Sequence, residues 1–447
     1  MHRFAHLSLL LVVVLSAATL AHAADRKPNL VLIMADDFGY EAVTANGGES
    51  YRTPSLDRLA AGGMRFEHCH VQPLCTPTRV QLMTGLYNIR NYVDFQLIDP
   101  TATTFGHLLK KAGYITAIAG KWQLGTDPAG PRKLGFDESV LWQLTRRPPR
   151  YANPGLEYNG VEKDFDNGEY GPKLINDFAV DFVTRHKDRP FFLYYPMILT
   201  HDPFQPTPDS KDWDPKAKGE TSSFSKEKVN LNVKYFADMT AYMDKMVGRL
   251  VAKLDELGLR ENTLIIFVGD NGTDVDVTSR FKGQPYRGGK GTRTARGTHV
   301  PLIANWPGHI PGGRVNTDLI GSVDFLPTLC EAAGASVPAT LQVDGRSFLP
   351  QLLGQRGNPR EWLYVWYARY GGPQAMFEFA MSKEHKLYRD GVFFDLKADP
   401  FEEKSPLLAA NLTGANAAAA KKLQAALDLH TNVRPAHLMQ HTERSKR

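Results

Sequence analysis

Cys75 stands two residues before Pro77 and four before Arg79, in the run CTPTRVQLMTG. Because proline is favoured in the first turn of a helix, this pattern predicts a helix that begins at Pro77 and runs through Met83. The unpaired N–H groups at the start of a helix favour an anion beside Cys75, and Arg79 can point back toward it. Most free cysteines are inert packing residues, so Cys75 and its neighbours alone are weak evidence for chemistry.

Two pairs of oxygen-bearing side chains are candidate metal ligands. Asp36 and Asp37 follow one apolar run, and Asp270 and Asn271 follow another. Neither pair has a histidine or cysteine beside it, so the set suits a hard cation, calcium or magnesium, better than zinc. Acidic residues after strands also form turns, but two pairs at matching strand ends favour the metal interpretation.

Four apolar runs share one form, in which polar residues follow directly after the run. They lack polar alternation, which is typical of parallel strands buried on both faces of a sheet. The carboxyl ends of such strands form the ligand-binding edge of an α/β sheet. We therefore expect Asp36, Lys121, His201 and Asp270 to gather at one edge. The predicted strands are Asn29–Ala35, Tyr114–Gly120, Phe191–Thr200 and Thr263–Gly269.

Helical spacing of apolar residues separates these strands, so the sequence predicts an α/β fold with a large, mostly parallel sheet between helices. The predicted helices are Ser55–Ala61, Phe105–Ala112, Leu174–His186 and Lys234–Leu257. From about residue 357, short strands of an antiparallel sheet and a closing helix follow. These are Trp362–Tyr370, Glu378–Met381, His385–Arg389, Val392–Asp395 and the helix Ala415–Leu429. We expect a main domain over 24–356, a smaller α+β subdomain over 357–433 and a basic tail over 434–447.

The N-terminus has the pattern of an export signal. A short basic start, an apolar stretch from Leu7 to Leu20 and the small residues around Ala23 predict a signal peptide over 1–23. We expect a periplasmic or secreted protein, and no later segment is long and apolar enough for a stable membrane anchor. The net charge of +5 over 447 residues gives no reason to expect nucleic acid as a partner. If Cys75 is the reactive residue, Cys69 and Cys330 remain, and they could form a disulfide in an oxidising compartment.

Several motifs resemble those of the formylglycine-dependent sulfatases of the alkaline-phosphatase-like superfamily. Residues 75–79 match the signature C-x-P-x-R, and GKWQLG at 120–125 resembles the family's G-K-W-H-L-G. THDPF at 200–204 resembles the family's H-x-P segment. GGKGT at 288–292 contains Lys290, which matches the family's second sulfate-binding lysine. The resemblance runs from Asn29 to Pro400 and implies hydrolysis of a sulfate ester.

The resemblance also implies the reactive group. A maturation enzyme would oxidise Cys75 to formylglycine, an aldehyde whose hydrate attacks the sulfur of the ester. Calcium would be held by Asp36, Asp37, Asp270 and Asn271, with residue 75 completing the shell.

Roles for the remaining site residues follow from the same family. Arg79 would hold the hydrate, Lys121 and Lys290 would bind the sulfate, and His201 would give a proton to the leaving oxygen. Gln123 occupies a position that is usually histidine; glutamine can hydrogen-bond but cannot titrate.

Two other functions remain open at this point. One is hydrolysis of phosphodiesters or phosphonates, and the other is a sulfated-glycan-binding protein that has lost catalysis, as Gln123 suggests. Export and a basic rim favour a sulfated carbohydrate as the substrate. The residues of that rim are Arg146, Arg147, Arg150, Arg280, Lys282, Arg287, Arg293 and Arg296.

Overall fold

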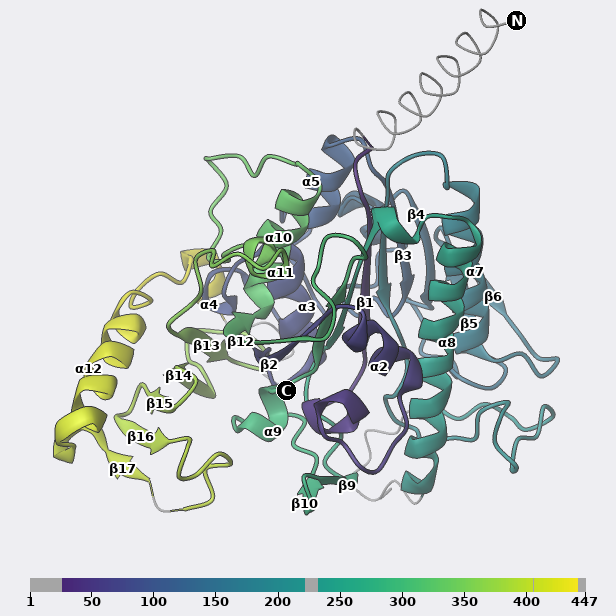
Figure 1. Cartoon of the computed structure of the whole chain (residues 1–447). Helices are drawn as coiled ribbons and strands as arrows, with labels where there is room; N and C mark the ends of the chain where they lie inside the picture. Colours follow the sequence, from purple (N-terminus) through teal and green to yellow (C-terminus); the bar gives the residue numbers. More distant parts are fainter. Residues whose placement is uncertain (1–25, 222–231, 405, 441–447) are drawn as a thin grey trace, which may run out of the picture.

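A ten-stranded sheet crosses the middle of the molecule, with helices on both faces (Figure 1). The computed structural model describes residues 26–221, 232–404 and 406–440. The predicted signal peptide and the end of the basic tail lie outside the described residues. The strand order is β12-β2-β11-β8-β1-β7-β3-β4-β5-β6.

The four predicted apolar strands are adjacent and parallel at the centre of this sheet. They are β8 (Thr263–Gly269), β1 (Asn29–Ala35), β7 (Phe191–Pro196) and β3 (Ile115–Gly120). Every residue of β1, β7 and β8 is buried, as expected for strands covered on both faces. Their carboxyl ends therefore meet at one edge, which confirms the predicted arrangement.

The outer strands make the sheet mixed. On one side, β11 runs antiparallel to β8 and β2, whereas β12 runs parallel to β2. On the other side, β4 continues the parallel set and the hairpin β5–β6 closes the edge. The bounds are β2 (Met64–His70), β4 (Glu138–Trp142), β5 (Gly155–Tyr158), β6 (Val161–Asp164), β11 (Leu302–Asn305) and β12 (Arg314–Gly321).

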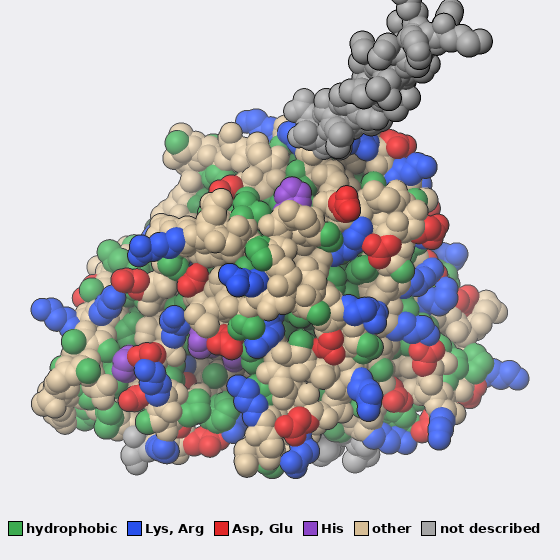
Figure 2. Space-filling view, viewed as in Figure 1, with side chains coloured by type: hydrophobic (Ala, Val, Ile, Leu, Met, Phe, Trp, Pro, Cys, Tyr) green, Lys and Arg blue, Asp and Glu red, His purple; other side chains and the backbone are tan. Residues whose placement is uncertain are grey.

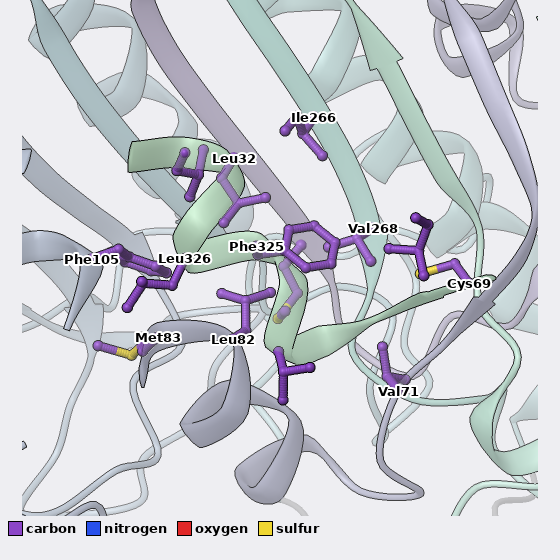
Figure 3. Close-up of a cluster of buried hydrophobic side chains, with 14 of the residues drawn as sticks. Leu32, Cys69, Val71, Leu82, Met83, Phe105, Ile266, Val268, Phe325 and Leu326 are labelled. Carbon is purple, nitrogen blue, oxygen red and sulfur yellow. The ribbon is translucent and has the colours of Figure 1, made fainter. Parts of the chain in front are cut away.

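Alternate residues of the central strands pack into two separate cores. Leu32 and Ile266 face α3 (Cys75–Thr84), α5 (Phe105–Lys111) and α10 (Phe325–Ala332), as Figure 3 shows. Their neighbours in the strands, such as Val31 and Ile265, belong to the opposite core, which contains residues of three other helices. Those helices are α2 (Pro54–Ala61), α7 (Gly171–Arg185) and α8 (Phe236–Glu256). This packing fixes the strand ends rigidly.

Two predicted boundaries were wrong at the site itself. The strand predicted over Phe191–Thr200 ends at Pro196, and the buried residues after it fold over the end of β1, where Thr200 N–H donates to the Asp36 carbonyl. The apolar run continues because this loop is buried too. Helix α3 starts at Cys75 rather than at Pro77, so Cys75 lies in the first turn.

The C-terminal region forms a second, antiparallel sheet of five strands with one long helix beside it (Figure 1, yellow). Leu423 and Leu427 of that helix are buried in the core, so the predicted small sheet with a closing helix is confirmed. The bounds are β13 (Leu363–Tyr367), β14 (Phe377–Met381), β15 (His385–Tyr388), β16 (Val392–Asp395), β17 (Leu407–Leu408) and α12 (Gly414–Asp428).

Short elements complete the described chain. They are α4 (Asn88–Asn91), α6 (Gly130–Lys133), β9 (Thr278–Phe281), β10 (Gln284–Arg287), α9 (Ala295–Thr298) and α11 (Leu349–Leu352). Among the described residues, no helix has the length and apolar character needed to cross a membrane. Cys69, Cys75 and Cys330 are all free thiols, so the pairing considered for Cys69 and Cys330 is not formed.

Candidate active site

Polar side chains from four strand ends contact one another at the carboxyl edge of the sheet. After β1, Asp36 accepts a hydrogen bond from Lys121 Nζ at 2.7 Å, and Lys121 directly follows β3. After β8, Asp270 accepts one from the Asp37 N–H at 3.0 Å. His201, in the loop after β7, lies with its Nε2 3.8 Å from Asp37 Oδ2. The sequence therefore placed these residues together correctly.

The Asp37 carboxylate lies near three other side chains of the site, Lys290, Asn271 and His201. Its Oδ2 pairs with Lys290 Nζ at 2.5 Å, and its Oδ1 accepts a hydrogen bond from Asn271 Nδ2 at 2.8 Å. Lys290 comes from the glycine-containing loop before α9 and also lies 3.2 Å from His201 Nε2. Burial alone would lower the pKa of Lys290, but Asp37 raises it above the usual range of lysine. Lys290 is therefore a permanent cation at the site.

Arg79 reaches the same edge of the sheet from α3, on the side of the core that contains Leu32 and Ile266. Its Nη2 lies 2.8 Å from Asp270 Oδ2, and its Nη1 donates to the Lys121 carbonyl at 3.1 Å. Only 1% of the Arg79 side chain is exposed, so this is a buried pair and not a solvated helix arginine. Removing one partner of such a pair leaves an uncompensated buried charge, which costs about 3–5 kcal/mol.

Cys75 opens toward these groups from the start of α3. Its Sγ lies 3.2 Å from Gln123 Oε1, and it packs with Phe95 and Tyr367. Burial raises the pKa of the Cys75 thiol, although Lys121 opposes this effect. A catalytic thiolate needs a lowered pKa. The environment therefore does not activate Cys75 as a thiol nucleophile, and it is compatible with a residue that is converted to another group.

The backbone is shaped to present these side chains. Asp37 and Gln123 have φ angles of 58° and 53°, in the left-handed region that costs non-glycine residues about 1–2 kcal/mol. At Gly120, a Cβ atom would meet the Pro196 carbonyl oxygen at 2.0 Å, so only glycine permits this approach. The Lys121 N–H donates to that carbonyl at 2.7 Å, which fixes the start of the loop that carries Gln123.

The acidic residues fit a cation. The Oδ1 atom of Asn271 is buried and has no hydrogen-bond partner among the described residues. Burial and the neighbouring Asp36 carboxylate raise the pKa of Asp270, although Arg79 opposes them. A hard cation would satisfy the orphaned oxygen and would favour the charged form of Asp270. Asp36, Asp37 and His201 also have ligand-type atoms within 4.8 Å of one another.

His201 is held by the residue that follows it. Its Nδ1 lies 2.8 Å from Asp202 Oδ1, so the ring can donate from Nδ1 and direct Nε2 toward Lys290. His201 is 14% exposed in its side chain, so it borders the pocket and not the core. This orientation places Nε2 beside Lys290 Nζ at the wall of the pocket.

The pocket above Cys75 has a volume of about 380 Å³. Lys121, Gln123, His201 and Lys290, which we expected to bind substrate, line it together with Cys75. Other residues that line the pocket were not predicted from the sequence; they come from loops and from the ends of β4 and β13. The missed residues are Phe95, Trp142, Asp202, Tyr367, Arg369 and Met376. Aromatic residues in such runs are otherwise typical of the core, so the sequence held no separate signal for them.

The predicted basic rim is only partly at the pocket. Arg147 and Arg150 line it, with the guanidinium of Arg150 4.0 Å from the Trp142 ring centroid. Arg146 instead pairs with Glu162 and Asp164 at the surface. The other five residues of the predicted rim do not line this pocket; they are Arg280, Lys282, Arg287, Arg293 and Arg296. Of these, Arg280 pairs with Glu49 and Arg296 pairs with Glu403. Figure 2 likewise shows basic and acidic side chains interspersed over one face.

A buried glutamate lies behind the acidic residues. Glu41 is 1% exposed, and its Oε1 accepts a hydrogen bond from Thr273 Oγ1 at 2.5 Å. Burial raises the pKa of Glu41 from 4.5 to about 7. Because the folded carboxyl binds its proton more tightly, it stabilises the fold below pH 4.5, and this contribution is lost as the pH rises to about 7.

Replacing Glu41 with glutamine removes that pH dependence. A shift of this size corresponds to about 3 kcal/mol, so we expect E41Q to gain about 3 kcal/mol relative to the natural protein between pH 4.5 and about pH 8. Urea unfolding of both proteins at the two pH values measures the difference. A difference that does not change with pH would contradict the assignment.

The comparisons with known proteins agree with this geometry. The sequence profile of the family described as Sulfatase matches residues 28–335, more than half of the chain. The chain belongs to the sulfatase family. A second profile, described as N-sulphoglucosamine sulphohydrolase, C-terminal, matches residues 294–428. The protein is thus a sulfuric ester hydrolase of the alkaline-phosphatase-like superfamily, as the motifs implied.

Individual relatives support the family assignment along nearly the whole chain. Human arylsulfatase A is 34% identical over 427 residues, covering 87% of this chain and 80% of that protein. N-acetylgalactosamine-6-sulfatase of Canis lupus familiaris is 32% identical, covering 79% and 72%. The crystal structure of Ps i-CgsB in complex with k-i-k-neocarrahexaose is similar with a TM-score of 0.77 and 25% identity, covering 94% of this sulfatase and 96% of that chain.

Proposed function

We propose that this sulfatase hydrolyses sulfate esters of a carbohydrate, using formylglycine made from Cys75 by a maturation enzyme. The observation that carries the proposal is the position of Cys75, buried at the start of α3 and beside Gln123, at the edge where the lysines and carboxylates meet. When formed, the aldehyde hydrate supplies the oxygen nucleophile that attacks the ester sulfur. The raised pKa of the thiol argues against Cys75 acting unmodified.

The chain's own cations would bind the sulfate group. Lys121 and Lys290 lie on two sides of the acidic residues and both line the pocket, so they can neutralise the charge that grows on the sulfuryl oxygens. Arg79, buried behind Cys75, would orient the residue at that position. Gln123 Oε1 faces Cys75 and can accept a hydrogen bond from a hydroxyl there, although it cannot take up a proton.

Proton transfer to the leaving oxygen would come from His201. Asp202 fixes the ring through Nδ1, which leaves Nε2 toward Lys290 and the pocket. In its protonated form, Nε2 would be the general acid that gives a proton to the leaving oxygen. Since Lys290 keeps its charge, it would bind sulfate and help to hold the histidine in place.

Calcium is the cation we propose for Asp36, Asp37, Asp270, Asn271 and residue 75. The ligand set is all oxygen apart from the thiol that would be converted, which suits calcium better than zinc and accepts magnesium less readily. Calcium would supply charge that aligns the oxygen at position 75 and stabilises the carboxylates.

Removing the cation is expected to lower thermal stability as well as activity. A ligand that binds only the folded state stabilises it by about 2.7 kcal/mol when present at about 100 times its Kd. We therefore expect a chelator to lower the Tm and added calcium to restore it, with magnesium restoring it less. Differential scanning fluorimetry measures this without any substrate. An unchanged Tm after removal of all metal, verified by elemental analysis, would contradict a bound calcium.

The substrate class is tested by release of sulfate. We expect sulfate to be released from at least one of carrageenan-like, fucan-like and glycosaminoglycan oligosaccharides, with phenyl sulfate as a small reference. Good activity on phenyl sulfate with no activity on any carbohydrate would reject the proposal that the substrate is a sulfated carbohydrate. Binding of sulfated glycans without release would support the non-catalytic alternative, and cleavage of phosphonate esters alone would support the other alternative.

The predicted signal peptide over 1–23 leads us to propose export to the periplasm or the exterior. N-terminal sequencing of the protein from the periplasm or medium of its expression host tests this, with a start near Ala24 expected. An uncleaved N-terminus in a cytoplasmic fraction would contradict it.

A further inference from the structure

One arginine at the mouth of the pocket has no assigned role. Arg369 follows β13 and lines the pocket together with Cys75. Its guanidinium carbon lies 5.0 Å from the Phe95 ring centroid and 5.5 Å from that of Tyr370. Its Nε atom is buried without a hydrogen-bond partner, and no carboxylate pairs with Arg369 anywhere in the described chain.

This arginine differs from the two lysines that line the pocket. Lys121 and Lys290 are each paired with an aspartate of the acidic group, so their charge is already compensated. Arg369 instead stacks on an aromatic ring, which holds the guanidinium in place without neutralising it. Burying an unsatisfied donor is costly, and an arginine fork matches carboxylate and sulfate groups by paired hydrogen bonds. A guanidinium held against an aromatic ring without a carboxylate partner is suited to binding an anion.

Arg369 and Cys75 are both neighbours of Phe95. Cys75 and Phe95 pack in the same cluster with Tyr367, and the Arg369 guanidinium carbon lies 5.0 Å from the Phe95 ring centroid. Arg369 and Cys75 also line the same pocket. A sulfate ester bound at Cys75 would therefore have the rest of its substrate in this pocket, beside Arg369.

We propose that Arg369 forms a second anion subsite in this pocket, and that the substrate therefore carries a second anionic group near the scissile sulfate. The group is a carboxylate or a further sulfate, since both match the guanidinium fork. This inference rests on the proposed function, because it assumes that the scissile ester binds at residue 75. It narrows the proposed substrate from sulfated carbohydrates in general to those with a second sulfate or a carboxylate near the scissile ester.

Paired aryl sulfates test the subsite with the mature enzyme. Phenyl sulfate carries one anionic group, whereas 2-, 3- and 4-carboxyphenyl sulfate add a carboxylate at three distances across one ring. For each, kcat and KM are measured with the natural protein, Arg369→Gln and Arg369→Lys. For each protein, the kcat/KM of the best carboxyphenyl sulfate is divided by the kcat/KM of phenyl sulfate. We expect R369Q to lower this ratio by about 10- to 100-fold, mainly by raising the KM of the carboxyphenyl sulfate. R369K should lie between, because it keeps the charge but loses the fork.

Arg293→Gln is the matched control. Arg293 also lies over an aromatic ring, 4.6 Å from the Tyr388 centroid, but it lines a neighbouring cavity and not this pocket. We expect R293Q to leave the ratio unchanged. An unchanged ratio in both R369Q and R369K, for all three isomers, would overturn the subsite. Absence of sulfate release by the natural mature protein from every aryl sulfate and from every carbohydrate substrate would instead reject the proposed function, so the two failures are distinguishable.

Discussion

Replacing Cys75 with alanine is expected to abolish sulfate-ester hydrolysis, with kcat lower by about ten-thousandfold or more. The loss is this large because no other described side chain of the pocket offers an equivalent nucleophile beside Lys121 and Lys290. The fold should persist, since Cys75 is one small buried side chain and its truncation leaves only a small cavity, costing about 1 kcal/mol. Release of sulfate from phenyl sulfate measures the effect.

Cys330→Ala is the control for this variant. Cys330 is equally buried in α10 but belongs to the hydrophobic core, away from the pocket. We expect C330A to lose stability and keep its activity per folded molecule. If C75A retained more than a tenth of the natural kcat, residue 75 would not be the nucleophile.

Replacing Asp37 with asparagine should have the second-largest effect. Asp37 pairs with Lys290, accepts from Asn271 and faces His201, so one carboxylate connects the proposed metal ligands with the sulfate-binding groups. We expect D37N to lower kcat by about a thousandfold, the scale of losing one preorganised electrostatic group. Calcium-dependent stabilisation should also disappear, because a neutral amide is a weaker ligand than a carboxylate.

Asp274→Asn separates this effect from a general loss of negative charge. Asp274 has a carboxylate oxygen within 4.8 Å of those of Asp37 and Asp202, but it lies farther along the loop after β8 than Asp270 and Asn271, which directly follow the strand. We expect D274N to change kcat by less than about tenfold and to keep the calcium-dependent rise in Tm. Equal effects of the two substitutions on Tm would show that Asp37 is not a specific metal ligand.

The sequence was sufficient to predict the chemical centre because long apolar runs specify buried parallel strands. Each run from β1, β3 and β8 ended within one residue of the observed strand, and the polar residue after it reached the expected edge. The exception was β7, where the buried loop through Leu199 continues the apolar pattern beyond the sheet. Apolar composition reports burial, and it does not by itself distinguish a strand from a buried loop.

The walls of the pocket were much less predictable. Phe95 and Trp142 come from separate parts of the chain, whereas Tyr367 and Arg369 come from the end of a strand in the small sheet. Aromatic residues in such runs pack in cores more often than they bind ligands, and an arginine after a strand is usually solvated. Their approach to Cys75 depends on how the small sheet packs on the main one, which local patterns do not encode.

The proposed conversion of Cys75 is tested most directly by mass spectrometry of the tryptic peptide Phe66 to Arg79, from protein made in a host with a competent maturation enzyme. Cys69 in the same peptide is an internal control, since it is buried in the core and lies outside the pocket. We predict an aldehyde in place of the thiol at residue 75 and an unmodified thiol at residue 69. An unmodified Cys75 in a preparation that hydrolyses sulfate esters would contradict the proposed mechanism.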